Sequence, residues 1–136
     1  MDLRSRVEQR LRRHGVRLTP QRVEIGMLLL AEPCHLSAEQ LLARLRAAGS
    51  GISKATVYNT LNLFARQGIV REVAVDPARL FYDSTTTPHH HFYNEDTGEL
   101  VDIDPAELSI HGCPQPPEGT DTTSMELVIR LRNRRG

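Results

Sequence analysis

The chain has 136 residues, a formal net charge of zero at neutral pH and only two cysteines, Cys34 and Cys113. This length fits one ordinary domain or two small ones. Two cysteines are too few for a secreted disulfide scaffold, and the sequence shows neither a long apolar run nor a signal-peptide start. We therefore expect a soluble, cytoplasmic protein that does not enter a membrane.

The zero net charge hides an uneven distribution. Residues 1–84 contain 13 Lys/Arg against 8 Asp/Glu, a balance of +5, whereas residues 85–136 contain 4 against 9, a balance of −5. A basic half is suited to contact phosphates, and an acidic half must serve another purpose. The split predicts two domains, 1–84 and 85–136.

The first two predicted helices are marked by spacing and by a capping residue. Residues 3–13 form an amphipathic helix because apolar residues recur four apart, at Leu3, Val7 and Leu11. Thr19 followed by Pro20 is a helix start, and the second helix should run to about Ala31, with Pro33 ending it. Its predicted buried positions are Val23, Met27 and Leu30.

Two further helices begin with a capping serine. Ser37 and Gln40 form a capping box for a third helix that ends near Gly49. Ser53 caps a fourth helix, which runs through about Gln67. The fourth helix should bury one apolar side, made of Val57, Leu61 and Phe64.

The other side of the fourth helix carries Lys54, Tyr58, Asn59 and Asn62, which are groups that reach phosphates and base edges in a major groove. Taken alone, this set is more often an ordinary polar surface, because most amphipathic helices have such a face. The next predicted elements favour DNA binding, because strands at Val70–Val75 and Leu80–Asp83 flank a turn and complete the order of a winged helix-turn-helix. Arg17 is a candidate for a minor-groove or phosphate contact, and Arg22 is a further candidate for a phosphate contact.

The second half should contain a small sheet. A short strand is predicted at residues 100–103, followed by a brief helix that Asp104 caps and that runs through Leu108. After a proline-rich loop, Met125–Arg132 alternates apolar and polar residues as a strand does. About fifty residues bury little core, so this half is expected to form a homodimer, which also suits a reader of two DNA half-sites.

Three consecutive histidines, His89, His90 and His91, lie between Asp83 and Asp102. Imidazole nitrogens and carboxylate oxygens together suit a divalent first-row metal. Alternate residues of a strand point the same way, so His89 and His91 can converge while His90 faces away. For any single histidine, a surface or hydrogen-bonded role is the alternative.

Three motifs resemble those of the ferric uptake regulator family: Leu18-Thr19-Pro20-Gln21-Arg22, Ala55-Thr56-Val57-Tyr58-Asn59-Thr60-Leu61 and the histidine block. The resemblance covers essentially the whole chain and is closest to the iron response and peroxide regulators. It implies an α+β protein, with an N-terminal winged helix-turn-helix and a small α/β dimerisation domain. It also implies a metal-dependent transcriptional repressor of iron, manganese or peroxide-stress genes, and not an enzyme.

The resemblance also implies site residues. One regulatory metal per chain, Mn(II), Fe(II) or Zn(II), is expected at His35, Asp83, His89, His91 and Asp102. His35 comes from the DNA-binding half and the others lie at or beyond the hinge, so the metal would set the DNA-binding conformation. The expected partner is double-stranded DNA with an A·T-rich inverted repeat.

Two departures from the family pattern affect these expectations. Asn94 and Thr97 stand where relatives carry a Cys-x-x-Cys pair, and the chain has no second pair, so no structural four-cysteine zinc is expected. Asn59 stands where many relatives carry arginine, so operator preference is expected to differ.

Several alternatives remain open. His90 with Glu107 or His111 is a candidate second metal site. Haem is a candidate ligand of His90 or of Cys113, which precedes a proline, and haem binding would then abolish DNA binding. Iron at the His/Asp site could instead sense peroxide. A metal-dependent hydrolase is the least favoured reading, because no residue reads as a nucleophile or general base beside an open metal position.

Overall fold

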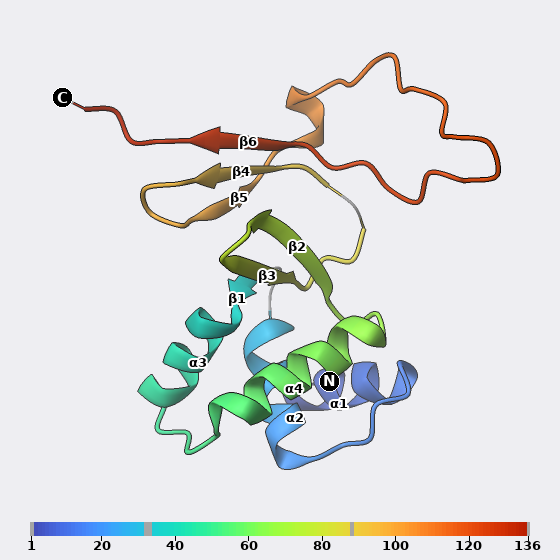
Figure 1. The fold of residues 1–136 in the computed structure, drawn as a ribbon. Helices are drawn as coiled ribbons and strands as arrows, with labels where there is room; N and C mark the ends of the chain where they lie inside the picture. Colours follow the sequence, from blue (N-terminus) through green and yellow to red (C-terminus); the bar gives the residue numbers. More distant parts are fainter. Residues whose placement is uncertain (1, 32–33, 88, 136) are drawn as a thin grey trace. The chain divides into compact units, whose positions relative to one another are not determined.

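The computed structural model describes residues 2–31, 34–87 and 89–135, and it divides into two compact units, residues 1–86 and 87–136 (Figure 1). The division falls two residues after the boundary expected from the charge pattern. Pro33, predicted to end the second helix, and Pro88, which precedes the histidine block, lie outside the described residues. In the described part of the chain, no helix is long and apolar enough to span a membrane.

The described residues of the first unit fold into helices followed by a β-hairpin, with one short strand in between. In chain order the elements are α1 (Leu3–Arg13), α2 (Pro20–Leu29), β1 (His35–Ser37), α3 (Ala38–Ala47), α4 (Lys54–Arg66), β2 (Arg71–Asp76) and β3 (Arg79–Asp83). This is a winged helix-turn-helix, as the sequence predicts, with α4 in the place of the recognition helix.

The predicted helix starts are found at the predicted residues. Thr19 Oγ1 accepts the backbone N–H of Arg22 at 3.2 Å, with Pro20 in the first turn. Ser37 and Gln40 form the reciprocal capping box of α3. Each cap satisfies backbone donors that a helix N-terminus otherwise leaves unpaired.

The core of the first unit lies between the helices and the sheet. Val57, Leu61 and Phe64 of α4 are fully buried, as predicted, and they belong to one cluster with Val7 and Leu11 of α1. Packing of these residues fixes α4 against the core and leaves its opposite face exposed.

The prediction for α2 was partly wrong. The helix ends at Leu29, and its fully buried residues are Ile25 and Leu29, whereas Met27 and Leu30 are only partly buried. The helix is apolar on most sides, so periodicity does not select one face. Gly26 decides it, because a Cβ there would come within 2.6 Å of Val7 Cγ1, and α1 therefore packs along this side.

The sheet of the first unit has the order β1-β3-β2, with both pairings antiparallel. The β2–β3 hairpin is the predicted wing, and Asp76 Oδ1 accepts the N–H of Ala78 in its turn at 2.8 Å. Strand β1 was not predicted, because three residues are too few to show alternation. Its register sets His35 opposite Asp83.

The second unit is a small sheet with the order β5-β4-β6, made of β4 (His91–Asn94), β5 (Leu100–Asp102) and β6 (Val128–Leu131). Strand β4 pairs antiparallel with β5 and parallel with β6. Asp104 caps a single 3-10 turn, η1 (Pro105–Glu107), where a brief helix was expected.

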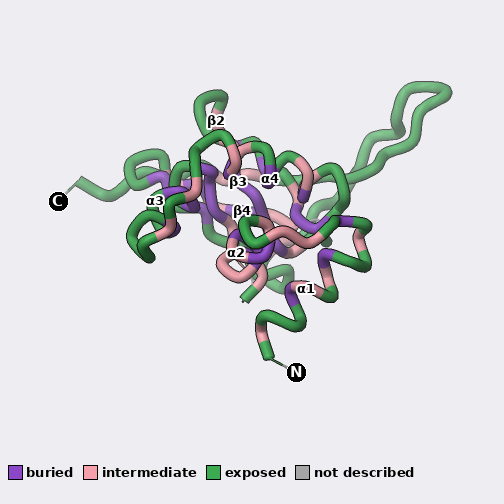
Figure 2. The backbone as a smooth tube through the Cα atoms, turned by 90° about the horizontal axis from the view of Figure 1, so that it is seen from below, coloured by how far each residue is buried: buried purple, intermediate pink, exposed green. Residues whose placement is uncertain are grey.

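Two expectations about these strands were wrong. The strand predicted at Met125–Arg132 is shorter, and Met125 and Leu127 before it are 43% and 38% exposed. The alternation of apolar and polar residues therefore begins before the strand, in a segment whose apolar side chains are exposed. Residues 109–127 are exposed throughout (Figure 2). His89 precedes β4 instead of lying on it.

Candidate functional site

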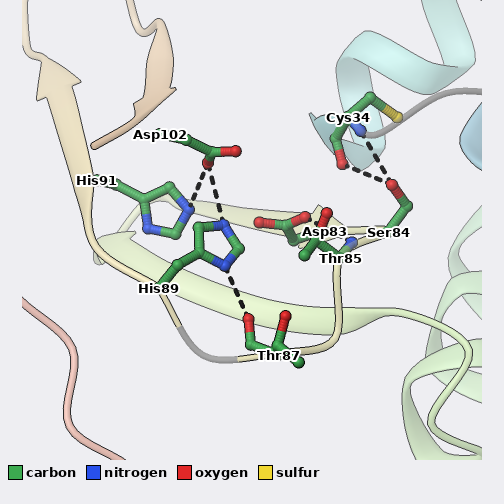
Figure 3. Close-up of polar contacts among 8 residues, drawn as sticks. All are labelled: Cys34, Asp83, Ser84, Thr85, Thr87, His89, His91 and Asp102. Carbon is green, nitrogen blue, oxygen red and sulfur yellow. Dashed lines mark hydrogen bonds and ion pairs between the residues drawn. The ribbon is translucent and has the colours of Figure 1, made fainter. Parts of the chain in front are cut away.

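Within the second unit, two histidines and one aspartate meet at a single oxygen (Figure 3). His89 Nε2 lies 3.0 Å and His91 Nε2 lies 3.2 Å from Asp102 Oδ1. The two rings have centroids 4.4 Å apart and are tilted by 53°. His91 and Asp102 face each other across the β4–β5 pairing, so their side chains share one side of the sheet.

The second nitrogen of His89 shows which proton the ring carries. His89 Nδ1 lies 2.8 Å from the carbonyl oxygen of Thr87 (Figure 3). A carbonyl only accepts, so Nδ1 must hold a hydrogen, and in a neutral ring Nε2 then presents a lone pair to the Asp102 carboxylate. Two acceptors 3.0 Å apart require a cation between or beside them, either a proton or a metal ion. The donor set therefore fits a divalent metal, and the bond to Thr87 is the outer contact that typically orients a metal-binding imidazole.

His91 occupies the interior position of this group. Its side chain is 1% exposed, against 51% for that of Asp102, and its backbone N–H donates to the carbonyl of Leu127 at 3.1 Å. The ligand atoms of His89, His91 and Asp102 lie within 4.8 Å of one another. The convergence of His89 and His91 follows from the loop before β4 as well as from the strand.

Within the first unit, the other two predicted ligands also lie together. His35 on β1 is paired with Asp83 on β3, and directly opposed residues of antiparallel strands point to the same face. Asp83 is buried, and its Oδ1 accepts the backbone N–H of Thr85 at 2.8 Å. The chain thus carries one imidazole–carboxylate pair on its first unit and a two-imidazole, one-carboxylate group on its second.

The residues considered for a second metal or for haem are placed differently. His90 Nδ1 accepts the backbone N–H of Leu127 at 2.8 Å, so its ring is turned away from Asp102, as expected. Glu107 and His111 are exposed, and among the described residues they do not form a three-ligand group with His90. Cys113 is also exposed, and its Sγ lies 3.9 Å from Met125 Sδ.

The exposed face of α4 carries most of the predicted DNA-binding residues. Lys54, Asn59 and Asn62 are exposed, and Tyr58 is half-buried. Before α2, Arg17 is exposed, and its backbone carbonyl accepts a hydrogen bond from Arg22 Nη1 at 2.8 Å. Arg22 thereby braces the loop that presents Arg17.

Sequence reasoning missed one residue on this face. Glu39, in the first turn of α3, accepts the phenol proton of Tyr58 at 2.6 Å. This hydrogen bond lowers the pKa of Glu39 and raises the pKa of Tyr58. An isolated glutamate in a helix N-terminus is a common stabilising feature, so only the spatial contact reveals its second partner.

The chain therefore combines a winged helix-turn-helix with a small sheet that carries a His/Asp cluster. Residues 13–129 match the model of the ferric uptake regulator family. Among curated relatives, the peroxide-responsive repressor PerR of Staphylococcus saprophyticus is 38% identical over 93 residues, which are 68% of this chain and 63% of that protein. The chain thus spans less than two thirds of that relative's length.

Solved structures give the same picture over nearly the whole chain. The ferric uptake regulator of Pseudomonas aeruginosa with manganese is 28% identical with a TM-score of 0.70, and the match covers 94% of this chain and 98% of that one. For the ferric uptake regulator of Vibrio cholerae the values are 26% and 0.72, with 92% and 98% covered. The chain belongs to the ferric uptake regulator family. The α+β fold expected from the sequence is confirmed, and the family is one of regulators, in agreement with the expectation that the chain is not an enzyme.

Proposed function

We propose that this protein is a homodimeric transcriptional repressor whose affinity for DNA changes when a divalent metal binds. The observation that carries the proposal is the pair of imidazole nitrogens at one oxygen of Asp102, with the other ring nitrogen of His89 held by the carbonyl of Thr87. Family membership and the polar face of α4 support the DNA-binding part.

The proposed ligand set joins the two groups, namely His35, Asp83, His89, His91 and Asp102. Three imidazoles and two carboxylates, with no thiolate, favour Mn(II), Fe(II) or Zn(II). An ion that draws ligands from both units binds best when the units adopt one arrangement. Metal binding would then favour the arrangement in which two recognition helices of a dimer match two half-sites of an inverted repeat.

The decisive experiment is fluorescence anisotropy of an A·T-rich inverted-repeat duplex at fixed salt, with Mn(II) and with chelator. We expect the affinity to differ by about tenfold or more, which is a coupling of about 1.4 kcal/mol. Asp102→Ala should abolish that difference, because it removes the oxygen shared by both histidines, and Asp102 is exposed enough to be replaced without loss of the fold. His111→Ala, an exposed histidine outside the group, is the matched control and should keep it.

Each outcome bears on a different part of the proposal. Equal affinity with Mn(II) and with chelator would rule out the metal switch. Absence of sequence-specific binding under both conditions would rule out the repressor function itself. A metal effect that His111→Ala abolishes and Asp102→Ala leaves intact would place the regulatory metal elsewhere.

Peroxide sensing is a second candidate, which the similarity to a peroxide-responsive repressor favours. We do not extend the proposal to haem. Cys113 lies in the long exposed loop with its sulfur against Met125, and the Nδ1 atom of His90 is used by the backbone of Leu127.

A further inference from the structure

The contact between Glu39 and Tyr58 joins two helices on the proposed DNA-binding face. The phenol of Tyr58, on α4, donates to Glu39 Oε1 at 2.6 Å, a length typical of a hydrogen bond from a hydroxyl to an ionised carboxylate. One face of the ring lies under Lys54 Nζ, which is 5.8 Å from the ring centroid and one turn earlier on the same helix. Tyr58 is therefore held at its hydroxyl and at its ring face.

The carboxylate itself is in place to remain charged. Glu39 lies in the first turn of α3, where the helix dipole favours an anion. The pKa of Glu39 is lowered chiefly by the Tyr58 hydroxyl and then by a backbone hydrogen bond, with Arg79 of the wing contributing a smaller attraction. Glu39 and Tyr58 also line one hollow together with Asn62, Arg79 and Tyr82.

These contacts restrict what Tyr58 can offer to DNA. A phenol whose proton is given to Glu39 has no donor left for a phosphate, and a fixed anion beside it repels phosphate oxygens. What remains available is the ring, whose natural partner among base edges is the methyl group of thymine. A free tyrosine would instead be able to donate to any phosphate and so bind without regard to sequence.

We propose that Glu39 is a specificity-determining residue, which positions Tyr58 of α4 to read a base edge and prevents it from binding phosphate. This inference rests on the proposed DNA-binding function. Under this proposal, Glu39 lowers the overall affinity for DNA and raises the discrimination between operator and other sequences, as a repulsive element in a specific interface does.

The test compares the affinity for the operator duplex with that for a scrambled duplex of equal length and composition. Glu39→Ala should lower this specificity ratio by about tenfold, the usual worth of one base contact, while affinity for the scrambled duplex stays equal or rises. Glu39→Gln should keep most of the ratio, because its amide oxygen still accepts the phenol proton. Glu72→Ala removes an exposed carboxylate of the wing and controls for charge alone.

A double-mutant cycle separates positioning from a general structural role. Tyr58→Phe should lower the ratio, and adding Glu39→Ala to Tyr58→Phe should lower it no further. If Glu39→Ala reduces the ratio equally with and without the Tyr58 hydroxyl, or leaves it unchanged in the wild-type background, the inference is wrong. Circular dichroism of each variant establishes that the fold is retained.

A measurement without DNA tests the contact itself. The phenolate absorbance of the wild type minus that of Tyr58→Phe isolates the titration of Tyr58, and Glu39→Ala should return its pKa towards the ordinary value. An unchanged titration would contradict the contact. If the wild type fails to distinguish operator from scrambled DNA, the proposed function fails; if it distinguishes them and Glu39→Ala does too, only this inference fails.

Discussion

Ser84 shows how one side chain can hold together the two strands that carry the proposed ligands His35 and Asp83. Its backbone N–H and its hydroxyl both donate to the carbonyl of Cys34, at 2.9 and 3.2 Å, and its Oγ accepts the N–H of Cys34 at 2.9 Å. Cys34 precedes His35 and Ser84 follows Asp83, so these bonds extend the pairing of the two proposed ligands by one step. Arg10 Nη2 donates to the Ser84 carbonyl at 3.2 Å and fixes the same point to α1.

Ser84→Ala should therefore destabilise the first unit and loosen the His35–Asp83 pair. Loss of the hydroxyl removes its hydrogen bonds with the backbone N–H and the carbonyl of Cys34, and we expect the free energy of unfolding in urea to fall by about 1–3 kcal/mol. The affinity for Mn(II), measured by competition with a chromophoric chelator, should fall as well. Ser109→Ala, at an exposed serine, should change neither quantity. A Ser84→Ala protein with wild-type stability would show that the hydroxyl contributes nothing.

At the residue scale, the sequence predicted side-chain orientations that depend on neighbouring residues in the chain. The opposite orientation of His90 follows from alternation along a strand, but the convergence of His89 and His91 also depends on the loop before β4, because His89 lies outside that strand. Glu39 was missed because its partner Tyr58 lies 19 residues away, and no short-range pattern joins a helix N-terminus to the middle of the next helix.

At the scale of elements, side-chain hydrogen bonds of two asparagines stabilise the turn between β4 and β5. Asn94 Oδ1 accepts the N–H groups of Asp96 and Thr97, at 2.9 and 3.1 Å, and its Nδ2 donates to Asn133 Oδ1 at 2.8 Å. The N–H of Asn133 donates back to Asp96 Oδ2 at 2.8 Å. Asn94 and Thr97 occupy the positions where the family resemblance places a zinc-binding cysteine pair. In this chain, the hydrogen bonds of Asn94 and Asp96 with Asn133 tie the turn to the segment after β6.

Asn94→Ala should release that segment. We expect faster hydrogen exchange of the amides in residues 128–131 and a loss of about 1 kcal/mol in the free energy of unfolding, because two backbone donors and one side-chain partner lose their acceptor or donor. Asn133→Ala should act through the same contact, so the double variant should lose less than the sum of the single ones. Additive losses would mean that the two asparagines act independently. Asn62→Ala, an exposed asparagine of α4, serves as the control.

The elements themselves were predicted to the extent that their ends carry caps. Thr19, Ser37 and Ser53 mark helix starts because each satisfies a backbone donor, and all three accept such a bond. Strand β6 was predicted too long, because the alternation of Met125 and Leu127 gives no information on whether anything covers them. Strand β1 has no such pattern and depends on pairing with β3.

At the scale of the whole molecule, the charge division predicted two parts and the structure contains two compact units. The proposed metal ligands are divided between these units. Neither spacing nor periodicity can pair His35 with residues more than fifty positions later, so that grouping came from family resemblance alone. The proposed division of the ligands between the units can be tested, because an oxidation at the bound metal should modify the residues that bind that metal.

The peroxide hypothesis provides this test. When the Fe(II)-loaded protein meets hydrogen peroxide, one histidine ligand should gain an oxygen atom, in a balanced conversion of histidine and peroxide into 2-oxohistidine and water. Because the reaction needs iron beside the ring, added oxygen should be found by peptide mass spectrometry on His35, His89 or His91, together with loss of operator binding. The Mn(II)-loaded protein should remain unmodified, and the exposed His111 should stay unmodified in both.

The positions that gain oxygen show whether one ion binds ligands of both units, and whether peroxide or metal availability is the signal. Oxygen on His35 together with His89 or His91 would mean that one ion reaches ligands of both units, since short-range oxidation requires direct proximity. Equal oxidation of His111 would indicate bulk damage and would remove the argument for a sensing site. No oxygen on any of the three ligands, with operator binding intact, would exclude peroxide as the signal and leave metal availability as the quantity that the protein senses.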